Sequence, residues 1–412
     1  MPGFPFLANG EGAMRPILVD VSRTMSRAFK PVPTGIDRVE RAYIRHFIDS
    51  PETLFVARQG SRHVVFDRDG MKQILARIDG TKPWSTPGKL ATLMPFSDQN
   101  SAARSATTNE FAAVRGSPQV IAAHVSGTIG RNCWYLNVGH NNLAGQWLDV
   151  LKTTGGMRIC AMIHDVIPLE YPQFQTAPSI KRFAERFAAI ANYADAILAN
   201  SRDTANRVKP RLSRQGRSVA IHAVPLGIEP AEKPAQMQEK PPNFIMLGTI
   251  EPRKNHRLVL QAWDMLPEGD RPILHIVGAR GWQNDDVFRW LDTSPLIDAS
   301  VLEHGPLPDE QARQLMVNST ALLFPSLAEG FGLPVLEALQ MGVPVVANRL
   351  PVLEELAGNS LLYMDSQDAK VWSTIISRIA KSSRAHIFPE GFDRIAIPRW
   401  AAHFQQVEAI LT

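Results

Sequence analysis

The sequence alternates short, largely apolar runs with longer amphipathic segments, and this alternation is the feature that most restricts its fold. The apolar runs end in Gly, Ser, His or Asp, and eight of them are clear: residues 17–21, 134–138, 158–163, 196–199, 244–247, 273–277, 321–324 and 343–347. Short, near-continuous apolar runs are typical of parallel strands that helices cover on both faces of a sheet. The pattern therefore predicts an α/β protein built from doubly wound parallel sheets.

The chain is too long for one ordinary hydrophobic core, because it has 412 residues and a domain has roughly 100–200. The segment EPAEKPAQMQEKPP is rich in Pro, Glu, Lys and Gln and offers almost nothing to bury, which is typical of a linker. We expect four parts: a first domain at 1–228, a linker at 229–242, a second domain at 243–385 and a C-terminal segment at 386–412.

Two regions depart from the alternation of strands and helices. Residues 83–116 are irregular and rich in Ser, Thr, Ala and Asn, so we expect a long loop or partly ordered insertion there. Residues 400–411 carry apolar side chains at helical spacing after Pro398, which predicts a terminal helix.

Composition excludes several classes of protein. Hydrophobic residues make up 44% of the chain and charged residues 20%, which suits globular domains rather than a disordered chain. The formal net charge of +4 is spread along the chain, so we expect no nucleic-acid partner, whereas anionic small molecules or an anionic membrane surface would suit it. Cys133 and Cys160 are the only cysteines and are too few for a disulfide framework or a zinc site.

The N-terminal residues lack the basic and continuous apolar segments of a signal peptide, and no stretch offers ~18 uncharged apolar residues. We therefore expect a cytoplasmic protein. The helix-like segment 180–193 carries Lys181, Arg182 and Arg186 on the side opposite its apolar residues. That side favours either peripheral contact with anionic lipid or simple exposure to solvent.

The strongest candidate site lies in ALLFPSLAEGFGLPVLEAL, residues 321–339. An apolar strand leads into a loop with Glu329, and a helix is expected to begin near Leu333 and to carry Glu337. Gly330 and Gly332 permit close approach of the backbone to a ligand, and the free N–H groups of a helix N-terminus attract phosphate. Glu329 and Glu337 can then face one crevice, although a helix-capping Glu329 with a solvated Glu337 is the alternative.

A second phosphate candidate is GTIEPRKN, residues 248–255, between an apolar strand and an amphipathic helix. Arg253 and Lys254 can hold an anion at the carboxyl edge of the sheet. Alternatively, this segment is an ordinary turn whose basic residues lie in solvent.

Two weaker candidates lie in the first domain. His164 and Asp165 follow an apolar strand and are expected to border a cleft between domains, although a single histidine is often structural. The segment TGIDR places Gly35 and Arg38 where they can close over a nucleotide or an acceptor, or simply lead into a helix. The acidic pair in DRD, residues 67–69, lies in a polar turn, so we expect no required metal.

Taken together, GTIEPRKN and the stretch at 304–339 resemble the retaining glycosyltransferases of family 4, and the likeness is specific over residues 244–365. The weaker segments TGIDRV, LNVGH, HDVIPLEYP and ANS are similar to the N-terminal half of the mannosyltransferase-like members. This resemblance implies the GT-B fold: two facing Rossmann-like domains, with a last helix that crosses back to the N-terminal domain. It places a nucleotide-sugar donor in the C-terminal domain and an acceptor mainly in the N-terminal one.

The resemblance also assigns roles to individual residues. Glu329 would contact the donor sugar near the reacting carbon and His164 would contact the sugar, so these two are the catalytic candidates. Lys254 would bind the diphosphate and Glu337 the ribose hydroxyls. The other implied donor-binding residues are Arg253, Gly248, Thr249, Gly330, Phe331, Gly332, Leu333 and Gly35. Thr249 departs from the arginine of many members, and Arg253 is the candidate to supply that charge.

The implied activity is hexose transfer with retention and without a metal or other cofactor, in polysaccharide biosynthesis. GDP-mannose is the expected donor, a glycan or lipid-linked oligosaccharide the expected acceptor, and the inner face of the membrane a possible peripheral location. A sugar-nucleotide epimerase, a glycogen-type transferase and a binder of nucleotide sugars without turnover are the alternatives, since fold alone does not separate them.

Overall fold

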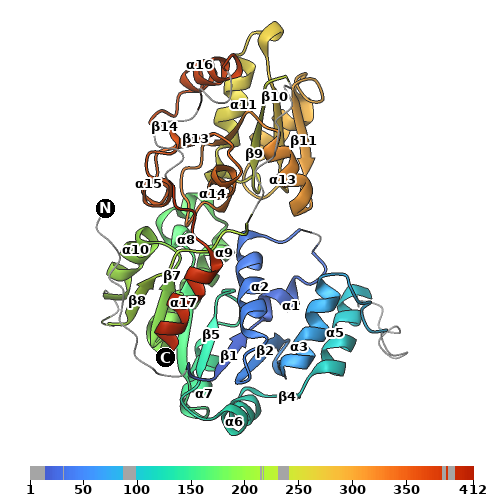
Figure 1. Cartoon of the computed structure of the whole chain (residues 1–412), viewed down its shortest axis with the longest axis vertical. Helices are drawn as coiled ribbons and strands as arrows, with labels where there is room; N and C mark the ends of the chain where they lie inside the picture. The colour runs from blue at the N-terminus through green and yellow to red at the C-terminus, as the bar shows by residue number, and fades with distance from the viewer. Residues whose placement is uncertain are drawn as a thin grey trace.

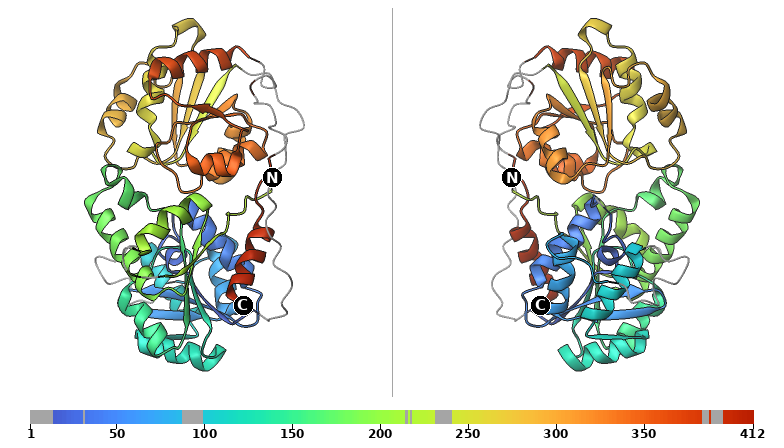
Figure 2. Two further views of the ribbon diagram at one scale, coloured as in Figure 1. Left: turned by 90° about the vertical axis from the view of Figure 1, so that its left-hand side faces the viewer. Right: turned by 90° about the vertical axis from the view of Figure 1, so that its right-hand side faces the viewer.

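The computed structural model describes residues 14–30, 32–86, 99–213, 216, 218–230, 241–382, 387 and 395–412. Within this part of the chain the strands form two sheets, one of eight strands in the first domain and one of six in the second. Figure 1 shows the second domain stacked above the first, and the side views of Figure 2 show the same arrangement. The predicted pair of α/β domains is confirmed, and each of the eight apolar runs overlaps a strand.

The first domain has the strand order β4-β3-β2-β1-β5-β6-β7-β8, parallel except where β3 pairs with β2 and β4. Its strands are β1 (Ile17–Asp20), β2 (Thr53–Gln59), β3 (Arg62–Phe66), β4 (Val114–Gly116), β5 (Trp134–Asn137), β6 (Arg158–Ile163), β7 (Ala196–Ala199) and β8 (Ala220–Ala223). Its helices are α1 (Ser22–Ser26), α2 (Gly35–Phe47), α3 (Arg68–Ile78), α5 (Gln99–Phe111), α6 (Pro118–Ile129), α7 (Gly145–Thr153), α8 (Ile167–Glu170), α9 (Ala177–Tyr193) and α10 (Arg202–Ser213), with a 3-10 helix at Pro172–Phe174.

The second domain has the order β11-β10-β9-β12-β13-β14, with every pair parallel. Its strands are β9 (Asn243–Leu247), β10 (Ile273–Val277), β11 (Val301–Gly305), β12 (Ala321–Phe324), β13 (Val345–Asn348) and β14 (Leu362–Met364). Its helices are α11 (His256–Asp264), α12 (Asp285–Thr293), α13 (Asp309–Val317), α14 (Leu333–Gln340), α15 (Pro351–Ala357) and α16 (Ala369–Ala380), with 3-10 helices at Pro252–Lys254 and Glu268–Asp270, and the chain ends in α17 (Trp400–Leu411).

The expected irregular insertion at 83–116 is wrong over much of its length. Residues 99–111 form α5, residues 114–116 form β4, and residues 87–98 lie outside the described part of the chain. Polar composition concealed the helix because its buried face uses Thr107 and Thr108. The Thr107 hydroxyl accepts a hydrogen bond from the Ser85 backbone N–H at 2.9 Å, and the Thr108 hydroxyl donates to the Arg104 carbonyl at 2.7 Å. Because both hydroxyl groups have hydrogen-bond partners, the two threonines can be buried like small apolar side chains.

The terminal helix α17 returns to the first domain, as the family resemblance predicts (Figure 2). The Trp134 indole N–H of β5 donates to the Leu411 carbonyl at 2.7 Å. Just before the helix, the Ile228 backbone N–H donates to the Pro398 carbonyl at 2.9 Å, so the outgoing and returning chains run beside each other between the domains.

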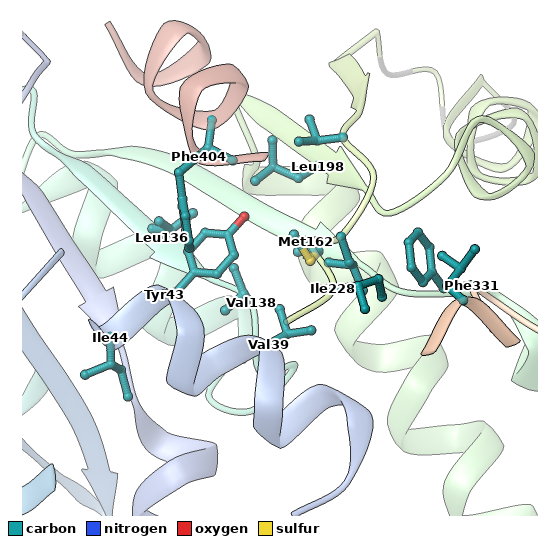
Figure 3. Packing of buried hydrophobic residues seen from close by; sticks show 14 of the residues in the cluster. Val39, Tyr43, Ile44, Leu136, Val138, Met162, Leu198, Ile228, Phe331 and Phe404 are labelled. Carbon is teal, nitrogen blue, oxygen red and sulfur yellow. The ribbon is translucent and has the colours of Figure 1, made fainter. Parts of the chain in front are cut away.

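A single cluster of buried apolar side chains runs through both domains. It includes Tyr43 of α2, Phe404 of α17, Ile228 between the domains and Phe331 of the second domain. Figure 3 shows part of this cluster, from Phe404 to Phe331. Because apolar burial is continuous across the interface, the domains are held in one closed arrangement.

We expect the docking of α17 to make stability depend on pH through His403. This side chain is buried, its Nδ1 lies 2.8 Å from the Pro225 carbonyl oxygen, and its Nε2 lies 2.7 Å from the Tyr43 hydroxyl. Burial lowers the pKa of His403 to about 4 from its ordinary 6.5. Between pH 6.5 and pH 4, His403 binds a proton in the unfolded chain but stays neutral in the folded one. The free energy of unfolding therefore falls as pH drops through this range.

Urea unfolding of the wild type and of His403→Gln at pH 7 and pH 5 measures this effect. The His403 contribution to the wild-type loss between these pH values is ~2 kcal/mol, and the variant lacks it. Equal pH dependence in the two proteins would show that His403 does not carry the effect.

Candidate functional site

The most buried charges of the second domain gather around Glu329. Its Oε1 lies 2.5 Å from the Lys254 Nζ, and its Oε2 lies 2.9 Å from an Arg253 guanidinium nitrogen. Arg253 also pairs with Glu251 at 2.7 Å and donates to the Ala328 carbonyl at 3.1 Å. The loop after β9 and the loop after β12 are therefore joined by charge at the carboxyl edge of the sheet, where parallel-sheet proteins place ligands.

Burial and charge act in opposite directions on these groups. Burial alone would raise the pKa of Glu329, but Arg253 and Lys254 outweigh it and lower that pKa to about 2. Burial lowers the pKa of Lys254, and only part of this is offset by Glu329. The pKa of Arg253 rises despite burial because Glu329, Glu251 and Asp165 surround it. At neutral pH, Glu329 is a carboxylate held between two cations.

The first domain contacts the loop that carries this cluster where the backbone of His164 packs against Gly330 of the second domain. A Cβ at position 330 would lie 2.2 Å from the His164 carbonyl oxygen, so only glycine permits this approach. The Gly330 carbonyl accepts from the Thr204 hydroxyl at 3.3 Å. A pocket with about 420 Å³ of free space lies beside this contact and is lined by residues of both domains, including Asp165, Tyr171 and Glu329.

His164 is buried and neutral at physiological pH. Its Nε2 lies 2.7 Å from the Val138 carbonyl oxygen, and because a carbonyl only accepts, Nε2 carries the proton. Burial lowers the pKa of His164 to about 4. The other ring nitrogen, Nδ1, is thereby left as an acceptor.

Glu337 lines a second pocket between the domains, and the expectation that one ligand meets both Glu329 and Glu337 stays a prediction. Glu337 forms an ion pair with Arg38 of α2, across the domain interface. The two side chains line a pocket with about 500 Å³ of free space, together with Leu247, Asp309, Arg313 and other residues of α13 and α14. Glu329 pairs with Lys254, whereas Glu337 lies one turn into α14 and meets the first domain through Arg38.

The remaining residues of the GFGLP loop shape the interface. Phe331 is buried in the apolar cluster, so its side chain is part of the core. Gly332 caps α14 with φ of 93°, a conformation that favours glycine. The Leu333 Cδ1 lies 3.2 Å from where a Cβ on Gly35 would be. The beginnings of α2 and α14 therefore meet across the cleft.

Gly248 and Thr249 lie at the end of β9. A Cβ on Gly248 would lie 3.4 Å from the Lys254 Cε, and the Gly248 φ of 136° also favours glycine. Thr249 is half-buried and packs beside Gly281, where a Cβ would lie 2.8 Å from the Thr249 Cγ2. The basic residues that this loop brings to the charged cluster are therefore Arg253 and Lys254, and Thr249 packs beside Gly281 instead.

Sequence reasoning missed two partners in this site. Arg38 is predicted to close over a ligand, but its pairing with Glu337, 299 positions further along the chain, leaves no periodic signal in the sequence. Glu251 stands two positions before Arg253 in GTIEPRKN. A carboxylate this close to two basic residues in the sequence could have indicated its pairing with Arg253.

Across the described residues, no helix combines the length and apolar character needed to cross a membrane. In the same part of the chain, no group of three or more His, Cys, Asp or Glu side chains is placed to hold a metal ion.

Comparison with known proteins finds similarity in sequence over part of the chain and in fold over almost all of it. Residues 228–387 match the family model described as Glycosyl transferases group 1. The serotype-specific mannosyltransferase WbdA of Escherichia coli is 29% identical over 239 residues, which cover 53% of this chain and 29% of that protein. The chain thus spans under a third of that relative's length.

Solved structures show which fold the chain resembles. Sucrose-phosphate synthase from Thermosynechococcus elongatus has a TM-score of 0.65 at 15% identity, covering 96% of this chain and 98% of that one. Anabaena HepE, solved with UDP and glucose, has a TM-score of 0.59 at 16% identity, covering 96% and 99%. The expected GT-B arrangement, two facing Rossmann-like domains with a returning C-terminal helix, is confirmed.

We expect the two glutamates to differ in their contribution to stability. Glu329→Gln leaves Lys254 and Arg253 short of a buried counter-charge and should cost ~3 kcal/mol of unfolding free energy. Glu337→Gln breaks a pair whose Arg38 side chain is 30% exposed and should cost at most about 1 kcal/mol. Urea titration at pH 7 measures both, and a Glu329→Gln cost no larger than that of Glu337→Gln would contradict the buried-cluster account.

Proposed function

We propose that this protein is a retaining glycosyltransferase that moves a hexose from a nucleoside-diphosphate sugar to a glycan or lipid-linked oligosaccharide acceptor. The observation that carries the proposal is the Glu329 carboxylate, held between Arg253 and Lys254 in a pocket that Asp165 of the other domain also lines. The match of residues 228–387 to Glycosyl transferases group 1 supports the reaction class.

Glu329 acts as a charge and not as an acid. With a pKa of about 2, it carries no proton to donate at neutral pH. A fixed carboxylate beside the anomeric carbon stabilises the positive charge that develops on the sugar as its bond to the leaving diphosphate breaks. His164 is neutral, and its free Nδ1 accepts a hydrogen bond from a sugar hydroxyl.

The leaving diphosphate is stabilised by Arg253, Lys254 and the N-terminus of α14. The C1–oxygen bond to the diphosphate breaks, and a new C1–oxygen bond forms to the acceptor on the same face of the sugar. The acceptor hydroxyl proton passes to the leaving phosphate oxygen. This route needs no second catalytic carboxylate and no metal, in contrast to the paired carboxylates of most retaining glycosidases.

The nucleoside occupies the pocket of α13 and α14, where Glu337 accepts hydrogen bonds from the ribose hydroxyls. In the described structure the Glu337 carboxylate forms an ion pair with Arg38. When a nucleotide binds, this carboxylate therefore contacts both Arg38 and the ribose hydroxyls. Mannose as the sugar is supported by the name of WbdA, and a nucleotide-sugar donor by HepE with UDP and glucose. GDP as the carrier, a cytoplasmic setting and peripheral contact with the inner membrane face stay predictions.

The alternatives are an epimerase, a glycogen-type transferase and a nucleotide-sugar binder without turnover. The binder is disfavoured because Glu329, Lys254, Glu337 and His164 are all present, a set that a degenerate site would be free to lose.

Thermal unfolding with GDP, UDP and ADP, each with and without magnesium, tests the donor site. We expect one nucleotide to stabilise the protein without metal, by about 2.7 kcal/mol at ~100 times its dissociation constant. Glu337→Gln should weaken that nucleotide about tenfold, because a charge-assisted hydrogen bond contributes roughly 1.5–3 kcal/mol. Glu329→Gln should change nucleotide affinity little and lower turnover ~100-fold or more. Unchanged affinity in Glu337→Gln would remove the ribose assignment.

A further inference from the structure

Arginines from two helices converge beside the loop that follows β5, away from the charged cluster of the second domain. Arg23 lies on α1, which follows β1, Arg27 directly follows the end of α1, and Arg182 and Arg186 lie on α9. We call these four the arginine cluster. Both helices lie on the side of the first domain that faces the second (Figure 1).

Packing places α1 on one side of the loop at residues 138–142. A Cβ on Gly139 would lie 3.0 Å from the Arg23 Cβ, so Arg23 rests on this glycine. The Asn141 amide donates to the Ser26 hydroxyl at 3.3 Å.

Packing places α9 on the other side of the same loop. The Phe183 ring is 6.3 Å from the His140 ring, centre to centre. Arg186 was expected on the side of α9 opposite the apolar residues, but it follows Phe183 by about one helical turn and is half-buried like Phe183, so that expectation is wrong for Arg186. His140 in turn lies 4.9 Å from the ring of His164. The arginine cluster therefore borders the predicted sugar-contacting histidine.

Positive charge exceeds negative charge in this region. Asp37 is the carboxylate that pairs with both Arg23, at 2.6 Å, and Arg27, at 2.7 Å. Glu40 is fully buried beside Thr24, and burial raises its pKa to about 8, so it adds no negative charge at neutral pH. Two guanidinium groups thus share one ionised carboxylate.

Within the part of the chain that the structure describes, Arg186 forms no ion pair. It is half-buried, and among the described residues no hydrogen bond or ion pair engages its guanidinium group. Burial lowers its pKa, and the nearby Arg182 and Arg23 lower it further, against a weaker opposing effect of Glu185. A half-buried guanidinium among like charges is a costly arrangement that an anion would relieve.

We propose that the arginine cluster binds a phosphate group carried by the acceptor, with Arg186 as its main ligand. This rests on the proposed function, because it assumes that the acceptor lies in the first domain. The proximity to His164 through His140 places that phosphate close to the point of sugar transfer. The acceptor class is therefore a phosphorylated sugar, either soluble or linked through a diphosphate to a lipid.

Simple contact of α9 with anionic lipid accounts for this arrangement less well. Lys181 and Arg182 are exposed, as a lipid-facing side chain must be, whereas Arg186 is half-buried near Arg23 and His140. A membrane surface would leave the inward charge without a partner.

Calorimetric binding of two probes tests the proposal: mannose 1-phosphate for a soluble acceptor, and geranyl diphosphate for a lipid-linked one. Each is titrated with and without a saturating nucleoside diphosphate, which fills the donor site. We expect at least one probe to bind beside the nucleotide, Arg186→Gln to weaken it about tenfold or more, and Arg186→Lys to recover most of the loss. The matched control Lys181→Gln removes the same charge from the exposed side of α9 and should change affinity less than about twofold.

Each outcome has one meaning. Binding of mannose 1-phosphate alone identifies a soluble phosphorylated acceptor, and binding of geranyl diphosphate alone a lipid-linked one. Equal affinity in Arg186→Gln and wild type, or binding of neither probe, overturns the proposal. Binding of phosphatidylglycerol vesicles that Lys181→Gln weakens and Arg186→Gln does not, with neither probe bound, assigns α9 to the membrane instead. Failure of every nucleoside diphosphate to bind counts against the donor site alone, because the effect of Arg186 is also measured without nucleotide.

Discussion

The buried ion pairs of Glu329 with Arg253 and Lys254 are the interaction on which the rest of the site depends. They join the loop after β9 to the loop after β12, and the second loop carries Gly330 to the backbone of His164. Desolvation makes these charges costly unless they stay paired, so the two loops are fixed relative to each other. The same pairing keeps Glu329 ionised, which is the state that an oxocarbenium-like sugar requires.

Contacts between the domains place this cluster opposite the first domain. The Glu355 carboxylate of α15 accepts from the backbone N–H groups of Arg202 and Asp203, at 2.7 and 2.8 Å, and so caps α10 of the other domain. On another side of the interface, the Trp282 indole donates to the Phe174 carbonyl at 2.9 Å. Together with the apolar cluster that runs through both domains, these bonds hold the domains in the closed arrangement.

Much of the fold was predictable because strands covered on both faces must be apolar along their length, and such runs are visible in a sequence. α17 and α14 were likewise predictable from spacing and from the Gly–Leu–Pro start of α14. α5 was not, because its buried face uses threonines. Within the site, Glu329 and Lys254 follow adjacent parallel strands, so their meeting was foreseeable. The Arg38–Glu337 pair was not, since it depends on how two separate domains close.

The central claim is retention during sugar transfer without a metal. Its most direct test is to incubate the protein with GDP-mannose and a phosphorylated mannose acceptor in EDTA, and to read the anomeric configuration of the product by proton NMR. The account predicts nucleoside-diphosphate release with an α-linked product from the α-linked donor. A β-linked product, or transfer that appears only when a divalent metal is restored, would contradict it.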